Sequence, residues 1–300
     1  MTEIKLYKGD CLQVMKQLPS NHYDVLLVDP PYEYLKHKLD KVFDEKAVLK
    51  EWDRILKNTG FIILFGRGMS FYRWNLLLND LGWEFKEEVI WDKLKNTSPV
   101  LPLMRVHETI SILSKQGHIN KTTVPYIKAH VTPETINNNI KSLKAGLNKN
   151  NKAYGELLHY LETNDMALAR KSKVNDQITF RPSNTFHQNS RIAGVAKAMM
   201  HGKREADIMS VSSPYRSHRF HPTQKPTELL ERLLKLVVQG KDDKIIDTFM
   251  GSGSTGVACA DLNNKENTNY SFTGIEIDDD YFKMAQTRID EVEKHDNKYL

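Results

Sequence analysis

Short apolar runs typical of buried parallel strands occur in two blocks, one near each end of the chain. The first block contains DVLLV at residues 24–28 and FIILF at 61–65, and the second contains KIIDT at 244–248 and a run at 272–277. Segments with the apolar spacing of amphipathic helices follow these runs in both blocks. This alternation predicts an α/β fold with a doubly wound, mostly parallel sheet. Because both blocks carry it, we expect one sheet assembled from the two ends of the chain.

The other periodic segments extend this expectation. Residues 57–60 (KNTG) indicate a helix stop, and Thr227 and Gly240 are the expected N-cap and terminator of a late helix. Further strands are expected at 4–7, 83–91 and 108–113, and helices at 11–18, 45–56, 70–81, 227–238, 255–262 and 281–292.

The middle of the chain is rich in Asn and Lys and differs from both flanks. Residues 115–220 hold 17 Lys and Arg against 7 Asp and Glu, whereas the whole chain has a net charge of only +5. A concentrated basic segment suits phosphate binding, although a solvated Lys-rich surface gives the same composition. We expect an inserted region at 115–214, partly helical at 156–161 and 192–200, between sheet-forming halves at 1–114 and 215–300. The candidate DNA contacts are Lys141, Lys144, Arg170, Lys171, Lys173, Lys203, Arg204, Arg216 and Arg219.

The sequence Asp29-Pro30-Pro31-Tyr32 directly follows the strand predicted at 24–28. Ligands of α/β proteins bind at the carboxyl ends of parallel strands. Two prolines stiffen the backbone there, so the segment presents a carboxylate, a carbonyl and an aromatic ring. Such a set can receive a base that has left its stack, with two acceptors for an amino group and a ring for stacking. A Pro-Pro loop with an Asp cap is the alternative without function.

A glycine-rich segment at 247–256 (DTFMGSGSTG) joins the strand predicted at 244–248 to a helix. Glycines in such a turn allow close approach of a ligand to the backbone and to helix N-terminal amides. The next predicted strand ends in Glu276 and Asp278, and an acid at that place commonly holds ribose hydroxyls. These features suit either a nicotinamide dinucleotide or S-adenosylmethionine.

Residues 221–226 (HPTQKP) open the helix predicted at 227–238. Lys225 and the hydroxyls at the helix start can face an anionic group. Polar residues that merely begin a helix would look the same.

Six landmarks stand in one consistent order along the chain: Gly9-Asp10, DPPY at 29–32, VHETI at 106–110, HPTQKP at 221–226, DTFMGSGSTG at 247–256 and GIEIDDDY at 274–281. In this order the sequence resembles the amino-group DNA methyltransferases of the β arrangement, over residues 4–114 and 215–290. The resemblance implies a Rossmann-like fold that binds S-adenosylmethionine, with the target-recognition region at 115–214. It departs from the family's usual pattern at Thr248, where proline is common, and at Ser254, where threonine is common.

The resemblance also implies roles for individual residues. Asp29, Pro30, Pro31 and Tyr32 would form the catalytic segment, and Asp29 in first position favours N6 of adenine over N4 of cytosine. In the cofactor site, Asp10 would bind the adenine amine, Glu276 the ribose and Lys225 the methionine carboxylate. The full expected cofactor set is Asp10, Lys225, Asp247, Phe249, Gly251, Ser252, Gly253, Glu276 and Asp278.

Other functions remain open on the sequence. They are N4-cytosine methylation, methylation of RNA or protein by the same fold, a non-catalytic DNA-binding protein on a methylase scaffold, and a dehydrogenase. A dehydrogenase, however, has no reason to carry DPPY or HPTQKP. Double-stranded DNA is the expected partner, and a homodimer and a cognate restriction endonuclease are further candidates.

Cysteine usage and hydropathy exclude several classes. The two cysteines, Cys11 and Cys259, lie far apart and form no CxxC pair, so we expect neither a metal site nor a disulfide framework. No run approaches the roughly 18 apolar residues of a membrane span, and the first residues lack a signal-peptide core. We therefore expect a cytoplasmic protein without a membrane partner.

Overall fold

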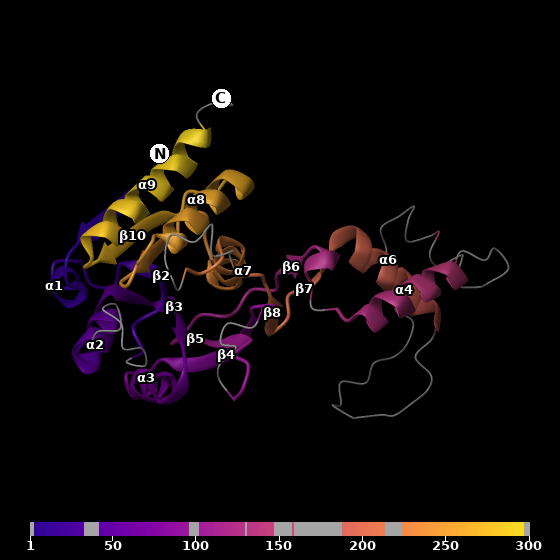
Figure 1. The fold of residues 1–300 in the computed structure, drawn as a ribbon, viewed down its shortest axis with the longest axis horizontal. Helices are drawn as coiled ribbons and strands as arrows, with labels where there is room; N and C mark the ends of the chain where they lie inside the picture. The colour runs from indigo at the N-terminus through magenta and orange to yellow at the C-terminus, as the bar shows by residue number, and fades with distance from the viewer. Residues whose placement is uncertain are drawn as a thin grey trace. The chain divides into compact units, whose positions relative to one another are not determined.

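The computed structural model describes residues 3–32, 42–95, 102–129, 131–146, 158, 188–213 and 224–296. The chain divides into two compact units (Figure 1). The sheet unit comprises Met1–Lys121 and Asp207–Leu300, and the helical unit comprises Thr122–Ala206.

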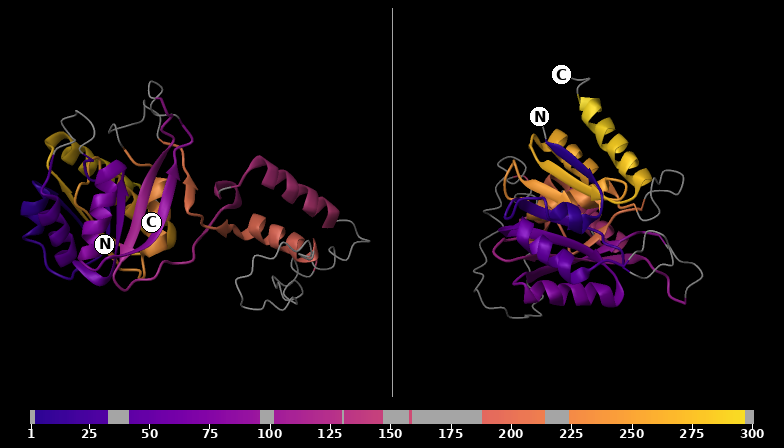
Figure 2. Two further views of the ribbon diagram at one scale, coloured as in Figure 1. Left: turned by 90° about the horizontal axis from the view of Figure 1, so that it is seen from below. Right: turned by 90° about the vertical axis from the view of Figure 1, so that its left-hand side faces the viewer.

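An eight-stranded sheet in the order β1-β10-β9-β2-β3-β5-β4-β8 forms the centre of the sheet unit. The first five strands of this order are parallel, β5 is antiparallel to β3 and β4, and β8 is parallel to β4. Strands from the two ends of the chain therefore lie side by side (Figure 2). The strands are β1 (Ile4–Lys8), β2 (Tyr23–Val28), β3 (Leu56–Gly66), β4 (Glu84–Asp92), β5 (His107–Ser114), β8 (Ile208–Ser210), β9 (Lys244–Asp247) and β10 (Ser271–Glu276).

Two hydrophobic cores lie on the two faces of the sheet. Leu26 and Val28 of β2 join a core with α1 (Cys11–Met15), α2 (Glu45–Ile55) and α3 (Gly68–Asp80). Val25 and Leu27 join the opposite core, with α7 (Thr227–Val237), α8 (Ser254–Glu266) and α9 (Asp279–Asp296). Because successive strand side chains point to opposite faces, the continuous apolar runs supply both cores. The predicted doubly wound, mostly parallel α/β fold is confirmed.

Three local expectations need correction. Residues 57–60, predicted as a helix stop, belong to β3, and the register of β2 against β3 shifts between Tyr23 and Val25. The N-cap of α7 is Pro226, with no side-chain cap, and Thr227 is the first helical residue. The segment β8 pairs with β4 in the main sheet, although the sequence placed it in the insert. The helical unit is accordingly narrower than the predicted insert at 115–214.

Among its described residues, the helical unit has the helices α4 (Pro133–Gly146) and α6 (Gln188–His201). A 3-10 turn, η1 (Tyr126–Lys128), and a two-stranded antiparallel pair, β6 (Thr123–Val124) with β7 (Lys203–Arg204), accompany them. The α6 helix contains the predicted helical run at 192–200, whereas α4 was not predicted. The run expected to be helical at 156–161 lies outside the described residues, apart from Leu158.

The start of α4 explains why an Asn-rich tract is helical. Thr132 accepts a hydrogen bond from the backbone amide of Thr135 at 3.1 Å, and Pro133 occupies the first helical position. A capping hydroxyl followed by proline is a strong start signal. Ile136, Ile140 and Leu143 then follow at helical spacing, which outweighs the weak helix propensity of asparagine.

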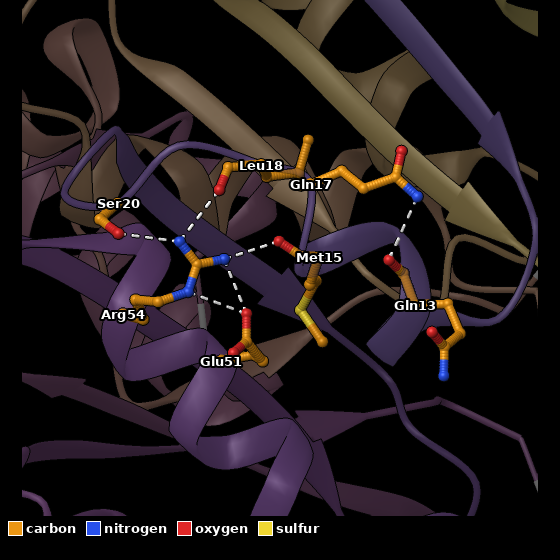
Figure 3. Close-up of polar contacts among 7 residues, drawn as sticks. All are labelled: Gln13, Met15, Gln17, Leu18, Ser20, Glu51 and Arg54. Atoms are coloured by element: carbon orange, nitrogen blue, oxygen red, sulfur yellow. Dashed lines mark hydrogen bonds and ion pairs between the residues drawn. The ribbon is translucent and has the colours of Figure 1, made fainter.

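Arg54, near the end of α2, fixes the turn between α1 and β2 (Figure 3). Its guanidinium donates to the backbone oxygens of Met15 at 2.6 Å and Leu18 at 2.9 Å, and to the Ser20 hydroxyl at 2.8 Å. Glu51 pairs with the same guanidinium at 2.7 Å. These bonds hold the start of the strand whose other end leads to the DPPY segment.

Candidate active site

The carboxyl ends of the parallel strands bring the predicted site segments to one edge of the sheet. Asp29 directly follows β2, Asp247 ends β9, Glu276 ends β10, and Asp10 follows β1. The strands that follow β2 and β9 in sequence lie on opposite sides of this pair, so the direction of winding changes between them. Such a switch point is where open α/β sheets bind ligands.

The antiparallel strand β5 contributes to the same edge from its first residues. Thr109 of β5 pairs with Gly66, the last residue of β3, so the neighbouring Glu108 also lies there. The carboxyl end of β4 is adjacent, because Asp92 pairs with His107. Lys93 therefore joins the edge as well.

A pocket at this edge unites the DPPY segment with the glycine-rich segment. Six of the predicted site residues line it: Asp29, Lys225, Asp247, Phe249, Gly251 and Ser252. Its other lining residues are Leu27, Phe65, Gln224, Leu230, Met250, Ser254 and Thr255. Of the other predicted catalytic residues, Pro30 is buried, and Pro31 and Tyr32 are partly buried.

Both carboxylate oxygens of Asp29 accept hydrogen bonds. The Tyr32 hydroxyl donates to one and the Lys225 ammonium to the other. Burial raises the pKa of Asp29 above its ordinary value, although the Lys225 charge opposes this shift. Burial and the nearby Asp29 charge raise the pKa of Tyr32 well above its ordinary value, so Tyr32 remains a donor.

Lys225 is held by two carboxylates and two rings. Besides Asp29, its ammonium lies 3.0 Å from Glu108, and it lies 4.9 Å from the centre of the Phe65 ring and 6.0 Å from that of the Trp91 ring. Burial acts to lower the pKa of Lys225, but the two carboxylates outweigh it and the pKa is raised. The ammonium that the resemblance assigns to a methionine carboxylate thus lies against protein carboxylates here. Its role toward a cofactor stays a prediction.

The sequence did not predict that Glu108 and Lys93 belong to the charged cluster around Lys225. Glu108 stands in the VHETI landmark, which carried no assigned role, and its carboxylate lies 2.6 Å from the Lys93 ammonium. Burial acts to raise the pKa of Glu108, but the two lysines outweigh it and the pKa is lowered. Lys93 gave no signal in the sequence, because only the pairing of β4 with β5 brings it to Glu108.

Two acids hold the glycine-rich segment in shape. Asp247 accepts hydrogen bonds from the Phe249 amide at 3.0 Å and the Thr255 hydroxyl at 2.7 Å. Burial raises the pKa of Asp247 to about 7, although these two bonds act to lower it. Glu276 accepts the Gly251 amide at 2.7 Å and also has a pKa raised by burial. These bonds fix the loop before any ligand is considered.

Positive backbone φ angles occur at Gly251 (+54°) and Gly253 (+77°). A Cβ atom on Gly253 would lie 2.8 Å from the Cβ of Ala285, whereas a Cβ on Gly251 would have no atom within 4 Å. Gly253 is therefore required by packing against α9, and Gly251 leaves open space beside the pocket.

Two further predicted cofactor residues cap helices. Asp10 accepts the Gln13 amide at 3.1 Å at the start of α1 and is exposed. Asp278 accepts the amides of Asp280 at 3.0 Å and Tyr281 at 3.2 Å at the start of α9. Neither lines the pocket, so their predicted contact with a cofactor remains a prediction.

Aromatic rings flank the same edge. The Phe249 ring lies 5.2 Å from that of Phe43, which lies 5.9 Å from Trp74, and Trp74 lies 6.2 Å from Tyr32. Sequence reasoning did not single out Phe43 or Trp74. Trp52 of α2 donates to the hydroxyl of Thr248 at 3.0 Å, so the residue that replaces the family's usual proline is held by a buried hydrogen bond.

The predicted DNA contacts belong to other parts of the chain. Lys141 and Lys144 are exposed on α4, and Lys203 and Arg204 form β7 of the helical unit. Arg170, Lys171, Lys173, Arg216 and Arg219 lie outside the described residues. Within the described ranges, no group of three or more His, Cys, Asp or Glu side chains suits a metal ion. Nor does any described helix have the length and apolar character of a membrane span.

A doubly wound sheet whose switch-point pocket is lined by Asp29 and a glycine-rich loop is the arrangement of α/β proteins that bind nucleotide-like ligands. A DNA methylase family model that covers N6 and N4 enzymes matches residues 23–287. The chain belongs to this N6/N4 DNA methylase family, as the resemblance implied.

Curated relatives match nearly the whole chain. The Type II methyltransferase M.HinfI of Haemophilus influenzae is 24% identical over 321 residues, which cover 97% of this chain and 70% of that protein. The Type II methyltransferase M.HpaI of Haemophilus parainfluenzae is 24% identical over 297 residues, which cover 95% of this chain and 74% of that protein.

Solved structures share the fold. The M1.HpyAVI–SAM complex has a TM-score of 0.55 and 17% identity, covering 95% of this chain and 98% of that one. The cytosine-N4-specific PvuII DNA methyltransferase also has a TM-score of 0.55, with 12% identity, and covers 99% of this chain and 93% of that one. Both likenesses show a common fold.

Proposed function

We propose that the protein transfers a methyl group from S-adenosylmethionine to the N6 amine of an adenine that has left the stack of duplex DNA. The observation that carries this proposal is a pocket that Asp29 and Lys225 line together with the glycine-rich segment. In the proposed scheme, Asp29 is the acceptor for the base amine and the glycine-rich backbone approaches the methyl donor in the same pocket.

The residues present fit the methyl donor. Gly251 leaves open space where a side chain would stand, and the partly buried Phe249 presents a ring beside it. Each carboxylate oxygen of Glu276 accepts one backbone amide, that of Gly251 at 2.7 Å and that of Asp278 at 2.8 Å. Because a carboxylate can accept about four hydrogen bonds, about two acceptor positions are left for a ligand. Glu276 would hold the ribose, and Asp247, Gly251 and Ser252 would shape the pocket.

S-adenosylmethionine supplies an activated methyl group on a sulfonium, so the protein has mainly to orient the reactants. An exocyclic amine is a weak nucleophile because its lone pair is delocalised into the ring, and it is out of reach within the stack. The Asp29 carboxylate and the Pro30 carbonyl would accept its two N–H groups. This favours a nitrogen whose lone pair is free and stabilises the positive charge that develops there.

Asp29 can perform this task without releasing Lys225. Its two oxygens accept one hydrogen bond each in the structure, from Tyr32 and Lys225, which leaves about two acceptor positions for the amine. The Tyr32 ring would stack on the extruded base, supported from behind by Trp74 at 6.2 Å. No metal ligand and no covalent bond to the protein enters this scheme.

Asp in the first DPPY position supports adenine as the methylated base, by the resemblance. The fold does not discriminate, since the similar PvuII enzyme is cytosine-N4-specific. The names of the two curated relatives support a place in a Type II restriction–modification pair, with a cognate endonuclease that reads the same sequence. We propose double-stranded DNA as the substrate and the cytoplasm as the location.

Product analysis tests the proposal directly. The protein is incubated with duplex DNA and S-adenosylmethionine, the DNA is digested to nucleosides, and the products are separated by mass spectrometry. N6-methyladenine is the expected product. N4-methylcytosine would overturn the choice of base, and no methylated base on any duplex would overturn the proposed function. Methylation-aware sequencing of DNA from expressing cells then gives the recognised sequence.

A further inference from the structure

Four charged side chains of alternating sign form a buried row that extends from the pocket. Lys93 contacts Glu108 at 2.6 Å, Glu108 contacts Lys225 at 3.0 Å, and Lys225 pairs with Asp29. Their side chains are only 9%, 15%, 8% and 24% exposed, in that order. Two positive and two negative charges leave the row neutral.

Stability alone does not account for this row. Taking charges out of water is expensive, and well-packed apolar residues at such sites are often equally or more stabilising. Lys93 is not among the residues that line the pocket, so its ammonium is not placed to contact a ligand there. It lies 5.3 Å from the centre of the Trp91 ring. Its partner Glu108, however, shares Lys225 with Asp29.

The charges in the row act on Asp29 in opposite directions. Burial raises the pKa of Asp29, Lys225 lowers it, and Glu108 raises it. A lone Glu108 would therefore work against the ionised form of Asp29 and would compete for Lys225. Lys93 neutralises Glu108, since it lowers the pKa of Glu108 together with Lys225.

We propose that Lys93 and Glu108 are positioning residues: Glu108 anchors Lys225 beside Asp29, and Lys93 offsets the Glu108 charge, so that the Asp29 carboxylate stays in its charged, acceptor form. The inference rests on the proposed function, in which Asp29 accepts the hydrogens of the base amine. Neither residue is required to touch the base or the methyl donor.

Other groups also face Asp29 and remain constant in the test. The charged and titratable groups around it in the described structure are Tyr32 on the same loop, Glu108 on β5, Lys225 before α7 and Asp247 on β9. Arg67, after β3, acts on Tyr32, and Glu276 acts on Asp247.

A charge-compensation cycle tests the proposal in the full chain. Lys93→Gln leaves the row with one excess negative charge, Glu108→Gln leaves one excess positive charge, and the double variant is neutral again. The pKa of Asp29 is read by carbon NMR of carboxyl-labelled aspartate, with the signal assigned from Asp29→Asn. The acid limb of kcat/KM for DNA methylation is measured on the same proteins. Lys93→Arg, which keeps the charge, is the matched control.

The expected shifts have opposite signs. Lys93→Gln should raise the pKa of Asp29 and move the acid limb up by about one pH unit, the usual size for one nearby charge. Glu108→Gln should move both down, the double variant should return close to the wild type, and Lys93→Arg should not move them. A purely structural pair would instead lower activity in each variant without such a sign change.

Folded single variants that shift the pKa of Asp29 in the same direction, or leave it unchanged, would overturn the proposal. If Lys93→Gln does not fold, the comparison of Glu108→Gln with the double variant still removes the Lys93 charge alone and should raise the pKa of Asp29. If the variants show the expected NMR shifts but the wild-type protein methylates no DNA, the ion-pair row is supported and the proposed function is refuted. The failure of one can therefore be told apart from the failure of the other.

Discussion

The carboxylate of Glu276, at the end of β10, accepts a 2.7 Å hydrogen bond from the backbone amide of Gly251 in the loop after β9. The acid expected to hold the ribose therefore also fixes the loop expected to approach the cofactor. Loss of this carboxylate should have two effects, a missing ligand contact and a looser loop.

Glu276→Ala should weaken S-adenosylmethionine binding by about 10- to 100-fold, the range for a lost charged hydrogen-bond partner. Glu276→Gln, which keeps one acceptor for the Gly251 amide, should fall between the alanine variant and the wild type. Calorimetric titration measures the affinities, with the exposed Asp280→Asn of α9 as control. Unchanged affinity in the alanine variant would move the cofactor site elsewhere.

Asp29→Ala should abolish methyl transfer and leave cofactor affinity nearly unchanged. The carboxylate is needed mainly when charge develops on the base nitrogen, so its loss should lower kcat by about 10²-fold or more. Single-turnover methylation and calorimetry give the two quantities. Glu84→Gln, an exposed change at the start of β4, is the control. Retention of more than about a third of the wild-type kcat would contradict the assigned role.

The two glycines with positive φ should respond differently to alanine. Gly251→Ala should lower the free energy of unfolding only by the backbone strain of a positive φ, about 1–2 kcal/mol, because the new methyl group meets no other atom. The methyl group would occupy open space beside the pocket, so the variant should also bind the cofactor more weakly. Gly253→Ala adds a collision with Ala285 and should lower the melting temperature further. Differential scanning calorimetry compares the two. An equal loss of stability would show that the α9 contact relaxes without cost.

The Asp247 carboxyl should make stability depend on pH. Its pKa is raised to about 7 in the folded protein, whereas an unfolded aspartate titrates near 4. The folded state therefore binds the proton more tightly. This contribution is complete below about pH 4 and is lost as the pH rises through about 7.

Urea unfolding of the wild type and of Asp247→Asn at several pH values isolates the contribution of the Asp247 carboxyl to the free energy of unfolding. The asparagine oxygen can accept from the Phe249 amide and its NH2 group can donate to the Thr255 hydroxyl, so both contacts remain possible in a side chain that cannot titrate. The free energy of unfolding of the wild type should fall relative to the variant between about pH 4 and pH 7. Parallel curves for the two proteins would exclude a raised pKa at Asp247.

Salt dependence tests the DNA-binding role of the helical unit. Log K for duplex DNA should fall linearly with log salt, by about 0.9 for each phosphate neutralised. Replacing the exposed Lys141 and Lys144 of α4 by Gln should reduce this slope by up to about 2 and weaken all sequences alike. The same substitutions at Lys46 and Lys50 of α2 remove equal charge from the sheet unit. A flat response of the intact protein would contradict DNA binding by the basic insert.

The sequence predicted those parts of the fold that depend on local patterns. The runs at 24–28 and 61–65 became β2 and β3 because strands buried on both faces need continuous apolar residues. By contrast, β8 has only three residues, and its place beside β4 depends on pairing more than a hundred residues away. No local pattern encodes such a contact.

The candidate site divides in the same way. Asp29, Asp247 and Glu276 were predictable because strand ends mark the binding edge of an α/β sheet. The pair of Lys93 and Glu108 was not, because only the register of β4 against β5 brings these two side chains together. Asp10 was chosen by resemblance and Asp278 as an acid at a predicted strand end, and the local geometry shows both as helix caps.

The strand order has a consequence for biosynthesis. The edge strand β1 pairs with β10, and β2 pairs with β9 on the side away from β3. These two early strands can therefore complete their pairing only after the two late strands have been synthesised. While the ribosome is still producing the chain, β1 has no partner among the described strands until β10, which ends at Glu276, has emerged. Long-range parallel pairing of this kind forms slowly and exposes apolar strands meanwhile. We therefore expect this chain to depend more on chaperones during translation than a protein whose neighbouring strands are consecutive in sequence. Fragments that end before β9 should also aggregate more readily.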